Sequence, residues 1–156
     1  MTTDEGINYD RSYLDKEFPI GTFEISREMI LEFSQASGEV NPIYVDEAQA
    51  AESEYGDIIA PPTFCNLFVN GGEKPDIKLE FGDIGFFAGQ AIESIAPIRP
   101  GDTVEVTSRL KEVYAKTGRS GTMVFAVWET KFDNQDGETV ALVDESYVRR
   151  NSRRAS

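Results

Sequence analysis

Residues 38–44, with the sequence GEVNPIY, place a carboxylate, an amide and a phenol around a proline bend. Glu39 could serve as a general base, and Tyr44 could donate a hydrogen bond. A tyrosine has a reference pKa near ~10, against ~6.5 for histidine, and is therefore a poor proton shuttle near neutral pH. Active-site loops of this type usually carry a histidine, yet the chain contains none. The segment indicates either a working active site with a substituted pair of catalytic residues or an inactive site.

Each polar residue of this segment also has a purely structural interpretation. Glu39 can be a solvated carboxylate at a helix end, and Tyr44 a packed aromatic ring with its hydroxyl hydrogen-bonded. Asn41 and Pro42 can simply shape the bend, since the residue before a proline avoids helical geometry. Cys65 is expected to be a small buried hydrophobic side chain rather than a nucleophile, because no base is available to activate it.

Composition narrows the classes of protein that fit. The chain has 156 residues, enough for one domain with a sizeable core. Its net charge of −13 argues against nucleic acid or an anionic membrane as a partner. Without histidine a metal site would need carboxylates almost alone, so we expect no metal. One cysteine and no apolar run of signal-peptide or membrane-span type favour a cytoplasmic location.

The helical signals lie in the first half of the chain. Ser26 is a good N-cap for a helix over 27–36, which Gly38 ends. Asp46 can cap a short second helix beginning at residue 47. Residues 63–70 are apolar on most of their surface, as expected of a buried helix of about two turns.

The strand signals lie mainly in the second half. Turn residues at 116–119 and 134–137 mark two hairpins. Helices followed by a run of strands predict an α+β domain with helix packed on one sheet face. The predicted strands are 18–25, 90–98, 103–114, 122–132 and 139–149. We expect a loosely attached arm over 1–17, a single domain over 18–150 and a frayed tail over 151–156.

Three segments resemble the MaoC-like dehydratases, over about residues 10–150 of the chain. Residues 33–46 are similar to the hydratase motif Gly-Asp-x-Asn-Pro-(Leu/Ile)-His, and 58–64 lie where catalytic members have Ala-His-Gly. Residues 87–90, leading to the Pro-x-x-Pro-Gly-Asp stretch of 97–102, resemble the N-terminal dehydratase-like branch. The pattern is most similar to accessory subunits of heterodimeric (R)-specific enoyl-thioester hydratases.

The resemblance implies a hot-dog fold, in which an antiparallel sheet wraps around a central helix. It implies an acyl-CoA substrate, no cofactor, and hydration of a trans-2-enoyl thioester to a 3-hydroxyacyl thioester. In active members an Asp and a His hold the water, and a backbone N–H polarises the thioester carbonyl. The substrate-binding positions it implies here are Asn41, Pro42, Pro62, Thr63, Phe64, Gly89 and Gln90.

The chain departs from this pattern at the catalytic positions. Glu39 stands in the Asp position and Tyr44 in the His position. Pro61 and Pro62 replace His and Gly, and a proline has no N–H to offer. The N–H of Thr63 could substitute only if the loop shifts.

Three functions fit these departures. The first is an acyl-shaping subunit of a heteromeric hydratase whose partner carries the Asp and His. The second is a self-sufficient hydratase or thioesterase using Glu39, and the third is an acyl-CoA-binding module without turnover. An exposed sheet edge favours pairing in each case, as a heterodimer or a homodimer. Four cations either meet the phosphates of coenzyme A or are solvated: Arg99, Lys111, Lys116 and Arg119.

Overall fold

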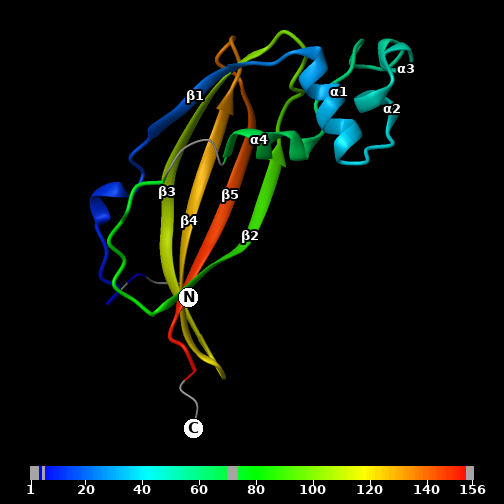
Figure 1. The fold of residues 1–156 in the computed structure, drawn as a ribbon. Coiled ribbons are helices and arrows are strands. Elements are labelled where there is room, and N and C mark those ends of the chain that lie inside the picture. Colours follow the sequence, from blue (N-terminus) through cyan, green and yellow to red (C-terminus); the bar gives the residue numbers. More distant parts are fainter. Residues whose placement is uncertain (1–3, 5, 70–73, 154–156) are drawn as a thin grey trace.

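Five antiparallel strands form one sheet in the order β1-β3-β4-β5-β2 (Figure 1). The computed structural model describes residue 4 and residues 6–69 and 74–153. The strands are β1 (Phe18–Glu24), β2 (Ile84–Ser94), β3 (Thr103–Gly118), β4 (Gly121–Asp133) and β5 (Thr139–Arg150). The predicted α+β class with one antiparallel sheet is confirmed.

Helical segments lie mainly between β1 and β2. They are η1 (Arg11–Tyr13), α1 (Arg27–Ala36), α2 (Pro42–Val45), α3 (Glu47–Ala51), η2 (Pro62–Cys65) and α4 (Asn66–Val69). The bounds predicted for α1 are confirmed: the Ser26 hydroxyl accepts from Met29 N at 3.1 Å, and Gly38 follows with φ +75°. The buried helix predicted over 63–70 is a 3-10 turn that continues into the short α4, and residue 70 lies outside the described residues.

The extent of β2 differs from the prediction. β2 begins at Ile84 rather than at residue 90, and it pairs with β5 at the sheet edge. Pro97 and Pro100 have no N–H to continue the strand pairing, and the chain crosses the sheet between the end of β2 and the start of β3. Gly101 N donates to Ile25 O at 2.7 Å, which fastens this crossover beneath α1.

Two apolar clusters share one face of the sheet. Under the helices, Phe64 and Phe68 pack edge to face at 5.5 Å, and Phe68 also packs on Phe132 of β4. Farther along β4, Trp128 forms a second cluster with Leu110. Residues 128 and 132 share a face because side chains alternate along a strand. The α4 helix lies across this face, as the predicted hot-dog arrangement requires (Figure 1).

The first 17 residues were expected to be loosely attached, and this is wrong for the part that the structure describes. Ile7 and Tyr9 are buried in the second cluster. Asp10 N donates to Ile77 O at 2.8 Å, and Glu80 N donates to Asn8 O at 2.9 Å. This segment therefore lies beside residues 74–81 (Figure 1) and packs with them against the second cluster.

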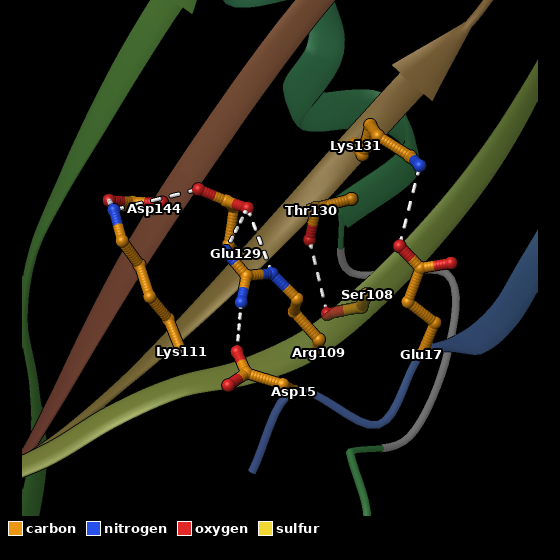
Figure 2. Close-up of polar contacts among 9 residues, drawn as sticks. All are labelled: Asp15, Glu17, Ser108, Arg109, Lys111, Glu129, Thr130, Lys131 and Asp144. Carbon is orange, nitrogen blue, oxygen red and sulfur yellow. Dashed lines mark hydrogen bonds and ion pairs between the residues drawn. The ribbon is translucent and has the colours of Figure 1, made fainter.

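Ion pairs fasten the end of the same segment to strands β3 and β4 (Figure 2). Glu17 meets Lys131 at 3.3 Å, and Asp15 meets the guanidinium of Arg109, which also binds Glu129 at 2.9 Å. Exposed pairs of this kind contribute little individually, so the buried apolar residues hold the segment. At the other terminus Ser152 N donates to Asp83 Oδ1 at 2.6 Å, and residues 154–156 lie outside the described residues. The domain limits at 18 and 150 stay predictions.

Candidate functional site

A pocket of about 230 Å³ lies between α2, η2 and the connection that follows β2. Tyr44, Pro62 and Cys65 contribute to its wall on the helical side, and Ser94 and Ala141 on the sheet side. We call it the Tyr44 pocket. It brings together two segments singled out in the sequence, the one ending in Tyr44 and the Pro61-Pro62 pair.

The Asn-Pro bend is the start of a helix. The Asn41 side chain accepts from Ile43 N at 3.2 Å, and Pro42 occupies the first helical position of α2. Asparagine as N-cap followed by proline is a recognised start signal, so the sequence could have indicated this short helix. Ile59 N donates to Ile43 O at 3.0 Å, and this bond fastens α2 beside the pocket. Asn41 and Pro42 thus position Tyr44.

Glu39 lies beside the pocket without lining it. Its backbone N–H donates to Ser34 O at 2.9 Å at the end of α1, and its side chain is half-buried. Burial raises the pKa of Tyr44, and the negative charge of Glu39 raises it further. The carboxylate is therefore within electrostatic range of the Tyr44 phenol.

The other positions that the resemblance implied are not all brought to the pocket. Pro62 lines it, whereas Phe64 is a core residue with 0% exposure, packed at 5.6 Å on Phe33. Thr63 is exposed in the first turn of η2, where N–H groups have no intrahelical acceptor. Gly89 lies at a bulge of β2, and Gln90 donates to Asn66 Oδ1 at 2.7 Å. Neither of these two residues lines the Tyr44 pocket.

The lining of the Tyr44 pocket is neutral. It contains no Asp, Glu, Lys or Arg among the described residues, in a protein with a net charge of −13. Burial raises the pKa of the Cys65 thiol to about 12, and the pKa of Tyr44 is also raised. Near neutral pH these two groups are protonated. They can donate hydrogen bonds, but they cannot take a proton from water.

Sequence comparison adds to this geometry. The family model described as "FAS1-like, dehydratase domain region" matches residues 15–143. The chain belongs to this family of MaoC-like dehydratases.

Individual relatives and solved structures agree with this family. A UPF0336 protein of Streptomyces avermitilis is 32% identical over 115 residues, which make up 70% of this chain and 76% of the relative. The 3-oxo-4,17-pregnadiene-20-carboxyl-CoA hydratase alpha subunit of Mycobacterium tuberculosis is 30% identical over 103 residues, 57% of this chain and 33% of that protein. The ChsH1-ChsH2 complex of Mycobacterium tuberculosis superposes with a TM-score of 0.70 at 24% identity, covering 90% of this chain and 85% of that chain. The MaoC-like hot-dog fold is thereby confirmed.

Within this MaoC-like fold, two residues near the pocket make contacts that the sequence did not indicate. Tyr55 lines the pocket and was missed. Arg99, considered for coenzyme A phosphates, donates through Nη1 to Tyr55 O at 2.5 Å and holds that residue in place. Lys111 lies on the face of the sheet opposite the Tyr44 pocket, where its Nζ meets Asp144 Oδ2 at 2.7 Å (Figure 2). No spacing in the sequence signals these contacts, because they join segments far apart along the chain.

A bidentate ion pair fastens α1 to the segment that leads into the pocket. Arg27 meets Asp57 through two bonds of 2.6 and 2.8 Å, and hydrogen bonding from Arg27 lowers the pKa of Asp57 from 3.8 to about 2. A carboxyl group whose pKa is lower in the folded state stabilises the protein at pH values above its ordinary pKa. This stabilisation is lost as the pH falls through the folded-state pKa. We therefore expect wild type to lose stability between about pH 4 and pH 2 more steeply than Asp57→Asn. Urea unfolding at several pH values in this range gives the free energy of unfolding of both proteins. The same pH dependence in wild type and Asp57→Asn would contradict the prediction.

No group of three or more Asp, Glu or Cys in the described part of the chain is arranged to hold a metal ion. In the same residues, no helix is both long enough and apolar enough to span a bilayer.

Proposed function

We propose that this chain is the acyl-binding, non-catalytic subunit of a cytoplasmic (R)-specific enoyl-CoA hydratase or dehydratase. The catalytic Asp and His would belong to a partner subunit with the intact family motif. The neutral lining of the Tyr44 pocket carries this proposal. Tyr44, Pro61 and Pro62, which the resemblance aligns with the family's catalytic positions, line this pocket, but the lining contains no group that is ionised near neutral pH.

The chemistry explains why this lining matters. Hydration adds the hydroxyl of water to the β-carbon of the enoyl thioester and a proton to the α-carbon. One group must accept a proton from the water while the α-carbon receives one. Tyr44, Ser94 and the Cys65 thiol can donate hydrogen bonds, and the remaining walls are mostly apolar. Such a pocket suits an acyl group better than the proton transfers.

An exposed sheet edge supports the proposed partner. Among the described strands β2 pairs only with β5, so its outer side leaves backbone groups available to another strand. Phe86, Phe87 and Ile95 in and beside this strand are 44%, 51% and 49% exposed. The similar hydratase subunit and the two-component complex named above support a second chain, and the relative's name supports coenzyme A as the carrier.

A self-sufficient enzyme is the second candidate. The observation that favours it is the charge of Glu39, which contributes to the raised pKa of Tyr44 and so lies near the pocket. In that case Glu39 would be the base of a hydratase or thioesterase, and the chain could act as a homodimer. A module that binds acyl-CoA without turnover is the remaining outcome.

Glu39→Gln separates these functions. In a complex with a partner that carries the intact motif, we expect the substitution to change enoyl-CoA hydration less than about twofold, because Glu39 takes no proton. Replacing the motif Asp of the partner by Asn is the matched control and should remove turnover. Loss of turnover in Glu39→Gln would favour the self-sufficient enzyme, and no turnover with any motif-bearing partner would favour the binding module.

A further inference from the structure

A second pocket, of about 410 Å³, lies on the same sheet face and shares no lining residue with the Tyr44 pocket. Strands β4 and β5 form its floor, and residues 74–79 border it. We call it the Trp128 pocket. Its volume falls within the range of small-molecule sites, roughly 300–1,000 Å³.

The walls of the Trp128 pocket are mostly aromatic and aliphatic. Trp128, the single tryptophan of the chain, is 5% exposed and lies near Tyr147, Ala126 and Ile77. The segment containing Ile77 is held by the hydrogen bond from Asp10 N, so the first residues of the chain brace this wall. The pocket is therefore a preformed cavity of the folded domain.

Arg149 gives this apolar pocket a cation. Its Nη2 donates to Gly82 O at 3.0 Å, whereas its buried Nε has no partner among the described residues. A Cβ at Gly85 would lie 3.2 Å from Arg149 Cδ, so glycine leaves room for this side chain against β2. An arginine carries five N–H donors, and the described structure uses one of them here.

The other charged groups of the pocket have partners within the protein. Lys74 Nζ lies 3.0 Å from the buried carboxylate of Glu145. The Asp76 carboxylate accepts from Lys78 N at 2.8 Å. Arg149, by contrast, forms no ion pair with any described carboxylate of this acidic protein.

We propose that the Trp128 pocket binds an amphipathic monocarboxylate, with its apolar body against Trp128 and Tyr147 and its carboxylate on Arg149. The guanidinium fork matches a carboxylate geometrically and binds it through charge-assisted hydrogen bonds. Burial of the apolar body against the aromatic walls supplies the remaining affinity. This site is separate from the proposed acyl-binding function, and its test uses neither a thioester nor a partner chain.

Octanoate is the probe, and the fluorescence of Trp128 is the signal. Titration of the full chain with octanoate should give a saturable fluorescence change, and 1-octanol should bind as an uncharged analogue. Arg149→Gln should weaken octanoate binding about tenfold or more and leave octanol binding unchanged. Ala126→Leu should abolish binding of both probes by filling the pocket, with circular dichroism confirming that the variant is folded.

Arg150→Gln is the matched control. It removes the same charge one residue later, from a guanidinium that lies 5.8 Å over Phe86 on the opposite side of β5. It should change octanoate binding less than about twofold. Equal weakening by both arginine variants would overturn the proposal, as would a fluorescence response that does not saturate or survives Ala126→Leu.

Discussion

Ala141→Leu is expected to lower enoyl-CoA hydration by the complex of this chain and its catalytic partner about 100-fold. Ala141 lies on β5, is 2% exposed and lines the Tyr44 pocket. A leucine here directs its additional carbons into a hollow of about 230 Å³, so the domain can accept it without moving its strands. The acyl group would lose that space, and a displacement of about 1 Å at the thioester can cost two orders of magnitude.

Ala48→Leu is the control for this prediction. It makes the same substitution on α3, where Ala48 is exposed, and should leave hydration unchanged within about twofold. Steady-state kinetics of both variant complexes provide the comparison. Wild-type turnover in folded Ala141→Leu would show that the acyl group does not occupy the Tyr44 pocket.

Phe64→Ala is expected to lower the free energy of unfolding by about 3–5 kcal/mol. Phe64 is 0% exposed and joins α1 to the helix that crosses the sheet, through edge-to-face contacts with Phe33 and Phe68. Truncation leaves a cavity between the helices and the sheet, and close-packed neighbours fill such a cavity only in part.

Leu67→Ala provides the comparison in the adjoining α4 helix. Leu67 is 50% exposed, so removing its side chain leaves no buried cavity. The substitution should lower the free energy of unfolding by less than about 1 kcal/mol. Urea unfolding followed by circular dichroism gives both free energies from the midpoint and slope. Similar losses for the two variants would contradict the assignment of Phe64 to the core.

Local patterns in the sequence predicted most of the strands and the first helix. β4 alternates buried Thr130 and Phe132 with half-exposed Glu129, Lys131 and Asp133, and this period identifies a strand with one covered face. Ser26 and Gly38 bracket α1 because capping depends on only a few adjacent residues. The family motif added the fold, which the comparisons confirmed.

Long-range placement could not be predicted in the same way. β2 lies at the edge beside β5, and no local pattern in the sequence specifies which strand it pairs with. Burial of Ile7 and Tyr9 depends on the space beside residues 74–81, which only the folded sheet defines.

The candidate site was predicted only in part, because some of its contacts are also long-range. The motif located Tyr44 and Pro62, and the structure places both in one pocket. The position of Phe64 in the core and the contribution of Tyr55 to the wall depend on how separate segments pack. Gln90 meets Asn66 across the space between β2 and α4, a contact between residues distant in sequence.

The most direct measurement is hydration of a trans-2-enoyl-CoA by the purified chain alone and again after addition of a partner with the intact Asp and His motif, followed as loss of the enoyl absorbance. We expect no turnover above the uncatalysed rate from the chain alone, because the described lining of the Tyr44 pocket contains no group that is ionised near neutral pH. Turnover should appear with the partner and should be lost again in Ala141→Leu. Turnover by the chain alone that disappears in Glu39→Gln would contradict the non-catalytic role and would identify Glu39 as the base.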